Sequence, residues 1–330
     1  MLVDRKTEHT TRIAPALRAI QTERDGLLAL EDALSGPLGS DVSQAIEAIL
    51  GLSGRVIATG MGKSGHVAQK MAATLASTGT PAFFVHPGEA GHGDLGMITQ
   101  EDAIIALSWS GETTELHPIL GYAKRFGITL IAITSKPEST LAKASDIPLI
   151  LPTATEACPH GLAPTTSTIM QLSLADGMAI ALLEARGFTA SDFGVFHPGG
   201  QLGAYLKQLA DVMHTGDAVP VTSQSVVMAE AIDIISQKGF GCVGLTGEDG
   251  RLSGIITDGD VRRNAGQNFL ELAASSVMTP EPITAQDDAF LGSVVHELNS
   301  RKITSMFVVD RDGRPVGLVH IHDLLRAGLA

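Results

Sequence analysis

The sequence predicts an α/β protein in which a doubly wound parallel sheet, flavodoxin-like or Rossmann-like, is followed by a duplicated pair of small α/β modules. Two observations predict this architecture. Between residues 55 and 186, short apolar runs alternate with helical patterns, as in successive βαβ units with helices on both faces of a sheet. The last third of the chain contains an internal repeat. A length of 330 residues leaves room for two or three domains.

The first 50 residues predict helices at Ile13–Leu34 and Val42–Leu50 that pack on the sheet domain, which we place at residues 51–203. The expected strands are Val56–Thr59, Ala82–Val85, Ala103–Leu107, Thr129–Ile133 and Ile147–Leu151. The expected helices are His66–Ser77, Leu116–Phe126 and Thr165–Arg186, the last followed by Gly187.

The last third repeats itself without gaps at an offset of 63, because Gly239–Arg263 aligns with Lys302–Arg326. Upstream, Val212-Met213 matches Val277-Met278 after a short slip. Two copies of this length do not make a solenoid, and they predict a duplicated α/β module at residues 210–268 and 274–330. The domain boundary is expected at residues 203–210.

Composition excludes several classes of protein. The formal net charge is −13 and aromatic residues make up only 4%, which disfavours a basic surface or a stacking platform for nucleic acid. The two cysteines, Cys158 and Cys242, give neither a disulfide framework nor a CxxC motif, so we expect a reducing compartment. No secretory signal is expected in Met1–Thr11, and no apolar stretch reaches the length of a membrane span. A cytoplasmic protein is predicted.

Polar loops follow the expected strands, at the edge where parallel α/β sheets bind ligands. The loop Gly60–Gly65 carries Ser64, and the loop after Ala103–Leu107 carries Ser108, Ser110 and Thr113. Backbone N–H groups at helix N-termini with small hydroxyls beside them favour a phosphate site. Helix capping alone would also explain either loop. A further Ser/Thr cluster, Thr165–Thr168, precedes the long helix and favours phosphate.

The glycines Gly60, Gly62 and Gly65 also fit the dinucleotide pattern GxGxxG. An acidic residue should then follow the second strand, but that strand ends at Phe84-Val85-His86. This disfavours a nicotinamide-dependent dehydrogenase. A GxxxxGK[ST] phosphate loop is not found, which disfavours ATP hydrolysis.

Candidate proton-transfer groups occur in loops or near element ends: Lys63, His86, His92, Glu112, Glu115, Glu156, His160 and His197. Single loop residues of these types are usually solvated, and it is their gathering at one edge of the sheet that favours chemistry. His86 and His92, with Glu89 and Asp94 between or beside them, offer metal ligands, although this spacing is not a known zinc signature.

The loop motifs resemble the sugar isomerase (SIS) domain, and the repeat resembles a tandem pair of cystathionine-β-synthase (CBS) domains. The combination is similar to the D-arabinose 5-phosphate isomerase family. The segments that carry this resemblance are His86–Met97, Glu156–Pro159, Leu162–Thr168 and His197–Gly200, together with the loops above. They are spread over nearly the whole chain.

The resemblance implies interconversion of D-ribulose 5-phosphate and D-arabinose 5-phosphate, a step toward the lipopolysaccharide sugar Kdo. The implied catalytic residues are Lys63, Glu115, Glu156 and His197. The implied substrate contacts are Gly79, Thr80, His86, His92, the stretch after Glu115, and Pro152, Thr153 and Ala154, beside the phosphate-loop residues Ser64, Ser108, Ser110 and Thr113. An inhibitory zinc ion would contact His86. No cofactor is required, and a homotetramer is expected, with no nucleic acid or membrane as partner.

Aldose–ketose isomerisation needs a C–H base, a group that moves the O–H proton, and a group that stabilises the oxyanion of a cis-enediolate. We assign these roles as hypotheses. Glu156 is the C–H base, His197 acts at the oxygens or in ring opening, Lys63 stabilises the enediolate or the phosphate, and Glu115 positions or relays.

The resemblance to CBS pairs implies nucleotide binding through a Thr-x-x-Asp motif. The first copy carries this motif as Thr257 and Asp260, whereas the second has His320 in place of the threonine and keeps Asp323. The expected effector is a nucleotide or a nucleotide sugar such as CMP-Kdo. A purely structural dimerisation module remains the alternative.

Two further alternatives stay open. One is an isomerase of the same fold that acts on another phosphosugar. The other is a non-catalytic phosphosugar-sensing regulator, which the short, acidic N-terminal segment disfavours because such regulators usually carry a helix-turn-helix.

Overall fold

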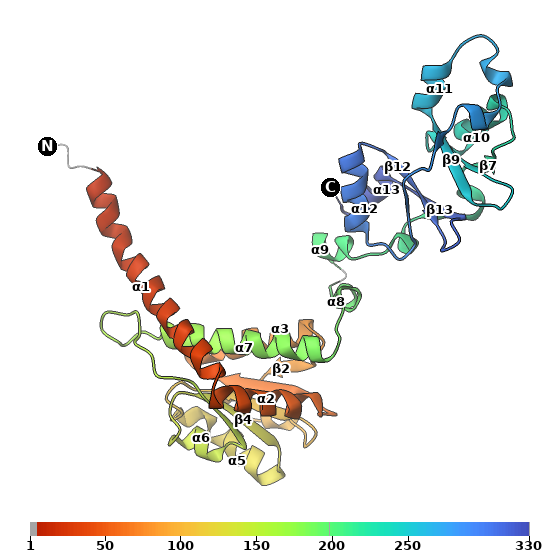
Figure 1. The fold of residues 1–330 in the computed structure, drawn as a ribbon. Helices are drawn as coiled ribbons and strands as arrows, with labels where there is room; N and C mark the ends of the chain where they lie inside the picture. Colours follow the sequence, from red (N-terminus) through yellow and green to blue (C-terminus); the bar gives the residue numbers. More distant parts are fainter. Residues whose placement is uncertain (1–4, 198, 330) are drawn as a thin grey trace. The chain divides into compact units, whose positions relative to one another are not determined.

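The computed structural model describes residues 5–197 and 199–329 (Figure 1), which form two compact units, Met1–Thr189 and Ala190–Ala330. The sequence placed the division later, at residues 203–210. The segment in between belongs with the second unit because Ala204 is buried in that unit's core and Tyr205 lies against Gly292.

The first unit alternates strands and helices around one parallel sheet. Its strands run in the order β2-β1-β3-β4-β5, the flavodoxin-like order of a doubly wound fold. The strands are β1 (Val56–Gly60), β2 (Ala82–Phe84), β3 (Ala103–Leu107), β4 (Thr129–Thr134) and β5 (Ile147–Ile150). The helices are α1 (Arg5–Leu34), α2 (Pro37–Leu50), α3 (Gly62–Ser77), α4 (Pro87–Ala90), α5 (His117–Phe126), α6 (Thr140–Ala144) and α7 (Thr166–Ala185), with the 3-10 turns η1 (Asp94–Met97) and η2 (Thr114–Leu116).

Helices cover both faces of this sheet and divide its core in two. One apolar cluster joins one face to α2, α3 and α7, and the other joins the opposite face to α4, α5 and α6. Every residue of β1 and β3 is buried, as expected for central strands covered on both sides. These strands are therefore continuous apolar runs, which is why the sequence revealed them.

Helix α7 has the length and apolar composition of a membrane span, and half of its 18-residue window is buried inside the fold. It packs against α1, α2 and α3, which is the environment of a core helix. Gly26 on α1 allows this close packing, since a Cβ there would overlap the side chain of Thr166.

The second unit begins with α8 (Ala190–Phe196) and α9 (Gly200–Tyr205) and then contains the two modules. The first module comprises β7 (Val221–Ser223), α10 (Met228–Lys238), β8 (Cys242–Thr246), β9 (Leu252–Thr257) and α11 (Asp258–Asn264). The second comprises β11 (Thr284–Ala285), α12 (Leu291–Arg301), β12 (Ser305–Val309), β13 (Pro315–His320) and α13 (Ile321–Arg326). This order confirms the repeat.

The modules exchange their leading strands. Strand β6 (His214–Thr215) precedes the first module but pairs with β13 of the second. Strand β10 (Thr279–Pro280) precedes the second module but pairs with β9 of the first. The methionines before these strands explain two repeated glycines: a Cβ on Gly317 would lie 2.6 Å from the Met213 sulfur, and Gly254 faces Met278 in the same way.

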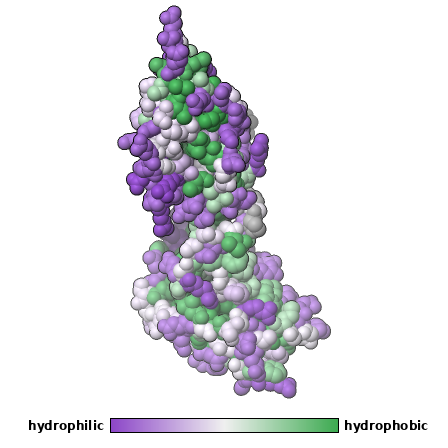
Figure 2. All heavy atoms as spheres, turned by 90° about the vertical axis from the view of Figure 1, so that its right-hand side faces the viewer, coloured by the Kyte–Doolittle hydropathy of each residue, from purple (hydrophilic) through white to green (hydrophobic). Residues whose placement is uncertain are grey.

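Apolar side chains also reach the surface of the protein. In Figure 2, hydrophilic and hydrophobic residues are intermixed over the face drawn. The most exposed large apolar residues on the N-terminal helix are Ile13, Leu17, Ile20 and Leu28. Helix α1 thus keeps an apolar surface in addition to the face that it buries against α7.

Candidate active site

The loop between β1 and α3 places Lys63 and Ser64 in the first turn of a helix that starts at the carboxyl edge of the sheet. Gly65 is required here, because a Cβ would lie 2.6 Å from the carbonyl oxygen of Gly60. The Lys63 side chain is exposed. Free backbone N–H groups and the helix dipole at this end favour an anion, and the phosphate site expected here stays a prediction.

Ser64 is held by a residue that the sequence analysis missed. Its hydroxyl donates a 2.9 Å hydrogen bond to Oε1 of Gln171, which lies on α7 and is only 1% exposed. The Nε2 atom of Gln171 is buried without a hydrogen-bond partner within the described part of the chain. The only amide side chain of a mostly apolar helix was the signal for this contact.

The second hydroxyl-rich loop follows β3. The hydroxyls of Ser108 and Thr113 lie 2.8 Å apart, and Ser108 Oγ also accepts the backbone N–H of Gly111 at 3.1 Å. Ser110 Oγ accepts a 3.3 Å bond from the N–H of Glu112 and is exposed. Ser108 therefore shapes the loop from a buried position, while Ser110 faces solvent.

The two glutamates after this loop differ in their surroundings. Hydrogen bonds from the hydroxyl and the N–H of Thr140 hold the pKa of Glu112 below its ordinary value. Glu115, in η2, is exposed and accepts a 3.2 Å bond from the neighbouring Thr114 hydroxyl. Of the two, Glu115 is the freer to approach a substrate.

His86 caps α4, which packs against η2 and α5 and so brings the His86 loop beside Glu115. His86 Nδ1 accepts the N–H of Gly88 at 3.1 Å, which leaves the ring proton on Nε2 in the neutral form. His92 is exposed in the turn that follows. The described residues contain no group of three or more metal-ligating side chains, and the zinc contact expected at His86 stays a prediction.

Glu156 caps the N-terminus of α7 from the loop after β5. Its Oε2 accepts the N–H and the hydroxyl of Thr165 at 2.7 and 2.8 Å, and the N–H of Ser167 at 3.4 Å. Burial alone would raise the pKa of Glu156, but hydrogen bonds from Ser167 and Thr165 outweigh it and lower the pKa. The carboxylate is therefore ionised at neutral pH.

The same loop contains the predicted substrate contacts at Pro152, Thr153 and Ala154. These residues closely follow β5, at the edge where the other loops also end. Thr153 is exposed, and Pro152 and Ala154 are half-buried. The topology thus gathers the loops of Lys63, Ser110, Glu115, His86 and Glu156 at one edge of the sheet.

Gly79 and Thr80 lie apart from this group. They precede β2, at the amino edge of the sheet. Thr80 is 2% exposed and accepts a 3.1 Å bond from Arg186, and a Cβ on Gly79 would meet the ring of Phe188 at 2.5 Å. Within one chain, these residues support packing rather than the gathered loops.

His197 belongs to the second unit, directly after α8. Its ring stacks on Phe193 with the centroids 3.9 Å apart, and its Nδ1 lies 3.0 Å from the carbonyl oxygen of Phe193. The sequence-based grouping of His197 with Lys63 and Glu156 therefore stays a prediction.

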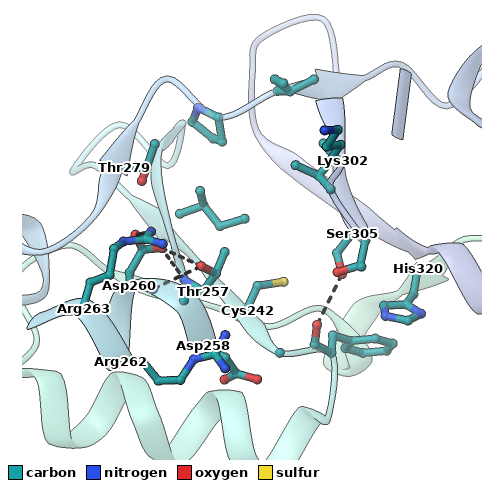
Figure 3. Close-up of a pocket in the computed structure, with 18 of the residues that line it drawn as sticks. Cys242, Thr257, Asp258, Asp260, Arg262, Arg263, Thr279, Lys302, Ser305 and His320 are labelled. Carbon is teal, nitrogen blue, oxygen red and sulfur yellow. Dashed lines mark hydrogen bonds and ion pairs between the residues drawn. The ribbon is translucent and has the colours of Figure 1, made fainter. Parts of the chain in front are cut away.

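A second candidate site is a cavity of about 820 Å³ within the second unit, lined by both modules. Figure 3 shows Thr257, Asp260 and Arg263 on one side of it and Lys302, Ser305 and His320 on the other. Asp260 Oδ2 accepts the N–H and hydroxyl of Thr257 at 2.8 and 2.7 Å, and Arg263 lies 2.6 Å from Oδ1.

The predicted effector residue Asp323 is differently placed. It does not line the cavity, and its Oδ2 is taken up by His214 Nε2 and the N–H of His320, both at 3.0 Å. The two halves of the cavity are therefore chemically unequal, as the loss of the second threonine suggested.

Comparison with known proteins shows which families the two parts of the chain match. Residues 50–181 match the SIS domain family, and residues 209–266 and 274–330 each match the CBS domain family. The arabinose 5-phosphate isomerase KdsD of Pseudomonas aeruginosa is 48% identical over 320 residues, covering 96% of this chain and 97% of that protein.

The chain belongs to the arabinose 5-phosphate isomerase family. KdsD of Salmonella typhi is 44% identical over 313 residues, with 94% of each chain covered. Among solved structures, E. coli CFT073 c3406 in complex with arabinose 5-phosphate is 42% identical, with a TM-score of 0.54, and the match covers 57% of this chain and 98% of that one. A putative sugar-phosphate isomerase from Listeria monocytogenes gives the same TM-score at 28% identity, over 58% of this chain and 98% of that one.

Proposed function

We propose that this chain is an aldose–ketose isomerase that interconverts D-ribulose 5-phosphate and D-arabinose 5-phosphate. The observation that carries the proposal is the near-full-length match to isomerases of this name, combined with ionisable and hydroxyl groups gathered at the carboxyl edge of the sheet. The reaction moves hydrogen between neighbouring carbons of one molecule, so by its chemistry it needs no redox cofactor.

Glu156 is the proposed C–H base. Its Oε2 is occupied by Thr165 and Ser167, so Oε1 is the oxygen available to take the proton. Hydrogen bonds fix the carboxylate in place, and its lowered pKa keeps it ionised. Both features favour a base that is ready at neutral pH, although a lowered pKa also makes the carboxylate a weaker base.

Lys63 is the proposed cation for the enediolate or the phosphate. It stands beside Ser64 in the first turn of α3, where helix-terminal N–H groups add positive potential. Glu115 and His86 flank the site from η2 and α4. We assign to Glu115 a positioning or relay role, and to His197 proton transfer at the oxygens or ring opening.

By analogy with the family, the product would feed Kdo and lipopolysaccharide synthesis in the cytoplasm. The two cysteines, half-buried Cys158 and buried Cys242, are free, which accords with a reducing compartment. We derive no step through zinc.

We also propose a homotetramer. An apolar groove of about 350 Å³ runs between α1, α2 and α7, lined among others by Leu30, Leu34, Val42 and Met178. Together with the exposed apolar residues of α1, it offers a surface that a second copy would cover. Analytical ultracentrifugation of the full chain tests this, and a monomer at micromolar concentration would contradict it.

The cavity between the modules is proposed to bind a nucleotide effector, such as an adenosine nucleotide or CMP-Kdo. Its volume falls in the range of small-molecule sites. Thr257 and Asp260 offer hydroxyl and carboxylate groups suited to ribose hydroxyls.

A direct assay tests the isomerase. The purified chain is mixed with D-ribulose 5-phosphate without added cofactor, and the products are resolved by chromatography. We expect D-arabinose 5-phosphate. Formation of a different aldose phosphate would favour the alternative of another phosphosugar, and no turnover of any pentose or hexose phosphate would favour a non-catalytic sensor.

A further inference from the structure

The internal repeat shows that the cavity between the modules is electrically polarised. At the offset of 63, neutral residues of the first module are replaced by cationic or protonatable residues of the second. All of them line the cavity, as the pairs Gly239 and Lys302, Thr257 and His320, and Gly259 and His322. Lys302 adds a formal positive charge, and the two histidines add ring nitrogens; burial lowers the pKa of His320, so its ring is neutral at neutral pH.

The half of the cavity formed by the first module is balanced by comparison. Its lining contains Asp258 and Asp260 together with Arg262 and Arg263, and Arg263 is paired with Asp260 at 2.6 Å. Two carboxylates and two guanidinium groups leave this half without a net charge.

A third carboxylate, Glu281, lines the cavity on the same side. Although it precedes the second module, it directly follows β10, which pairs with β9 of the first module. Its backbone N–H donates a 3.2 Å hydrogen bond to the carbonyl oxygen of Ser253 on β9. Glu281 therefore adds negative charge to the half that already holds Asp258 and Asp260.

The opposite half, formed by the ends of α12 and β13 and the starts of β12 and α13, brings no carboxylate to the lining. The acid of this half, Asp323, is turned to His214 and Arg326 instead. The positive potential of the cavity is therefore concentrated on the side of Lys302.

Lys302 occupies a backbone conformation that disfavours a side chain. It ends α12 with φ +56°, and its counterpart Gly239 ends α10 with φ +74°. Glycine is the usual residue at such a left-handed C-cap, since a Cβ is penalised there. A lysine kept in this position, on a cavity wall, points to a function for its charge.

His320 presents a donor to the same side. Its Nδ1 accepts the N–H of His322 at 3.2 Å, so the ring proton of the neutral form sits on Nε2. The ring of His322 lies 4.8 Å away. Beside Lys302, these rings complete a group of N–H donors on one wall of the cavity.

We propose that the cavity binds one nucleotide per chain in a single direction. The ribose lies on Thr257 and Asp260, and the phosphate or another acidic substituent lies toward Lys302, His320 and His322. This rests on the proposed nucleotide effector and specifies its chemistry: a nucleoside bearing an acidic group. The second half-site does not take a ribose of its own, since it lacks the threonine and its acid, Asp323, does not line the cavity.

Calorimetry on the full-length protein tests the direction, with AMP and CMP as charged probes and adenosine and cytidine as neutral ones. Lys302→Gly installs the residue of the other repeat and relieves the backbone, so its melting temperature should not fall. We expect it to weaken AMP or CMP binding about tenfold, the size of one lost charged contact, and to leave binding of the matching nucleoside unchanged. His320→Thr, which keeps a helix-capping residue, should have the same selective effect.

The expected stoichiometry of the unaltered protein is one nucleotide per chain. Two equivalent sites, equal loss of nucleotide and nucleoside binding, or unchanged AMP and CMP affinity in both variants would each overturn the proposal. An absence of binding by all four probes would overturn it as well. Isomerisation of ribulose 5-phosphate is measured on the same preparation. Loss of nucleotide binding between the modules is thereby distinguished from loss of the proposed isomerase activity.

Discussion

The carboxylate of Glu156 accepts a 2.7 Å hydrogen bond from the backbone N–H of Thr165, so the proposed base also caps helix α7. The hydrogen bonds to Thr165 and Ser167 thereby fix the position of the Glu156 carboxylate and also keep it ionised. Glu156→Gln keeps an oxygen for the cap but removes the base. We expect turnover to fall by about 10²–10⁴-fold, with loss of C–H deuterium exchange in D₂O.

The control for this substitution is Glu101→Gln, on the amino side of β3, where the same change leaves the site untouched. It should retain full activity. Deuterium exchange at the normal rate in Glu156→Gln would remove Glu156 from the role of base.

The cap also predicts a pH dependence of stability. The pKa of Glu156 is lower in the folded chain than its ordinary value of 4.5. Its ionised form therefore stabilises the fold above pH 4.5, and this contribution is lost as the pH falls through the lower folded pKa. Denaturant unfolding should show the wild type more stable than Glu156→Gln at pH 7, with the difference shrinking on acidification. A difference that grows as the pH falls below 4.5 would contradict the assignment.

Gln171 is expected to act on phosphate binding through Ser64. Gln171→Leu removes the partner of the Ser64 hydroxyl and should raise KM for the phosphosugar about tenfold, with a smaller change in kcat. The matched control is Gln69→Leu, at an exposed position of α3, the helix that carries Ser64. A lowered kcat at unchanged KM would instead place Gln171 in the chemical step.

The close approach of Gly317 to Met213 predicts an overpacking effect. Gly317→Ala should cost about 1–3 kcal/mol of unfolding free energy, because a Cβ would lie 2.6 Å from the sulfur. Met213→Ala should restore much of this loss in the double variant, as thermal unfolding can measure. Additive losses would show that the two residues do not share the strain.

Thr257 is predicted to serve both the fold and the effector. Thr257→Val removes the hydroxyl that bonds Asp260, costing about 1 kcal/mol as a lost helix cap. It should also abolish nucleotide binding, whereas Thr257→Ser should preserve it. Calorimetry with AMP and CMP checks this. Unchanged affinity in Thr257→Val would show that Thr257 caps the helix but does not bind the nucleotide.

Much of the first unit could be predicted from sequence because its strands are buried on both faces. Ala103–Leu107 was predicted with the bounds observed, and Thr129–Ile133 differs from β4 by one residue. The short helices α6 and α8 were missed, since helices of five and seven residues are too short to show a helical repeat of apolar residues.

The candidate site was predictable where residues share a loop or an edge, and not where they meet across the fold. Ser64 and Gln171 are 107 residues apart, and only the packing of α3 on α7 joins them. Gly79 and Thr80, taken from the family resemblance, stand at the opposite edge of the sheet. The repeat revealed both modules, but the partner of a two-residue strand such as β6 depends on tertiary proximity.

The exchanged strands β6 and β10 affect how the two modules of the second unit unfold. Each module supplies an edge strand to its neighbour, so a fragment cut between them would leave both sheets one strand short. An effector bound in the shared cavity would accordingly stabilise both modules together. The two modules should therefore unfold in one cooperative transition.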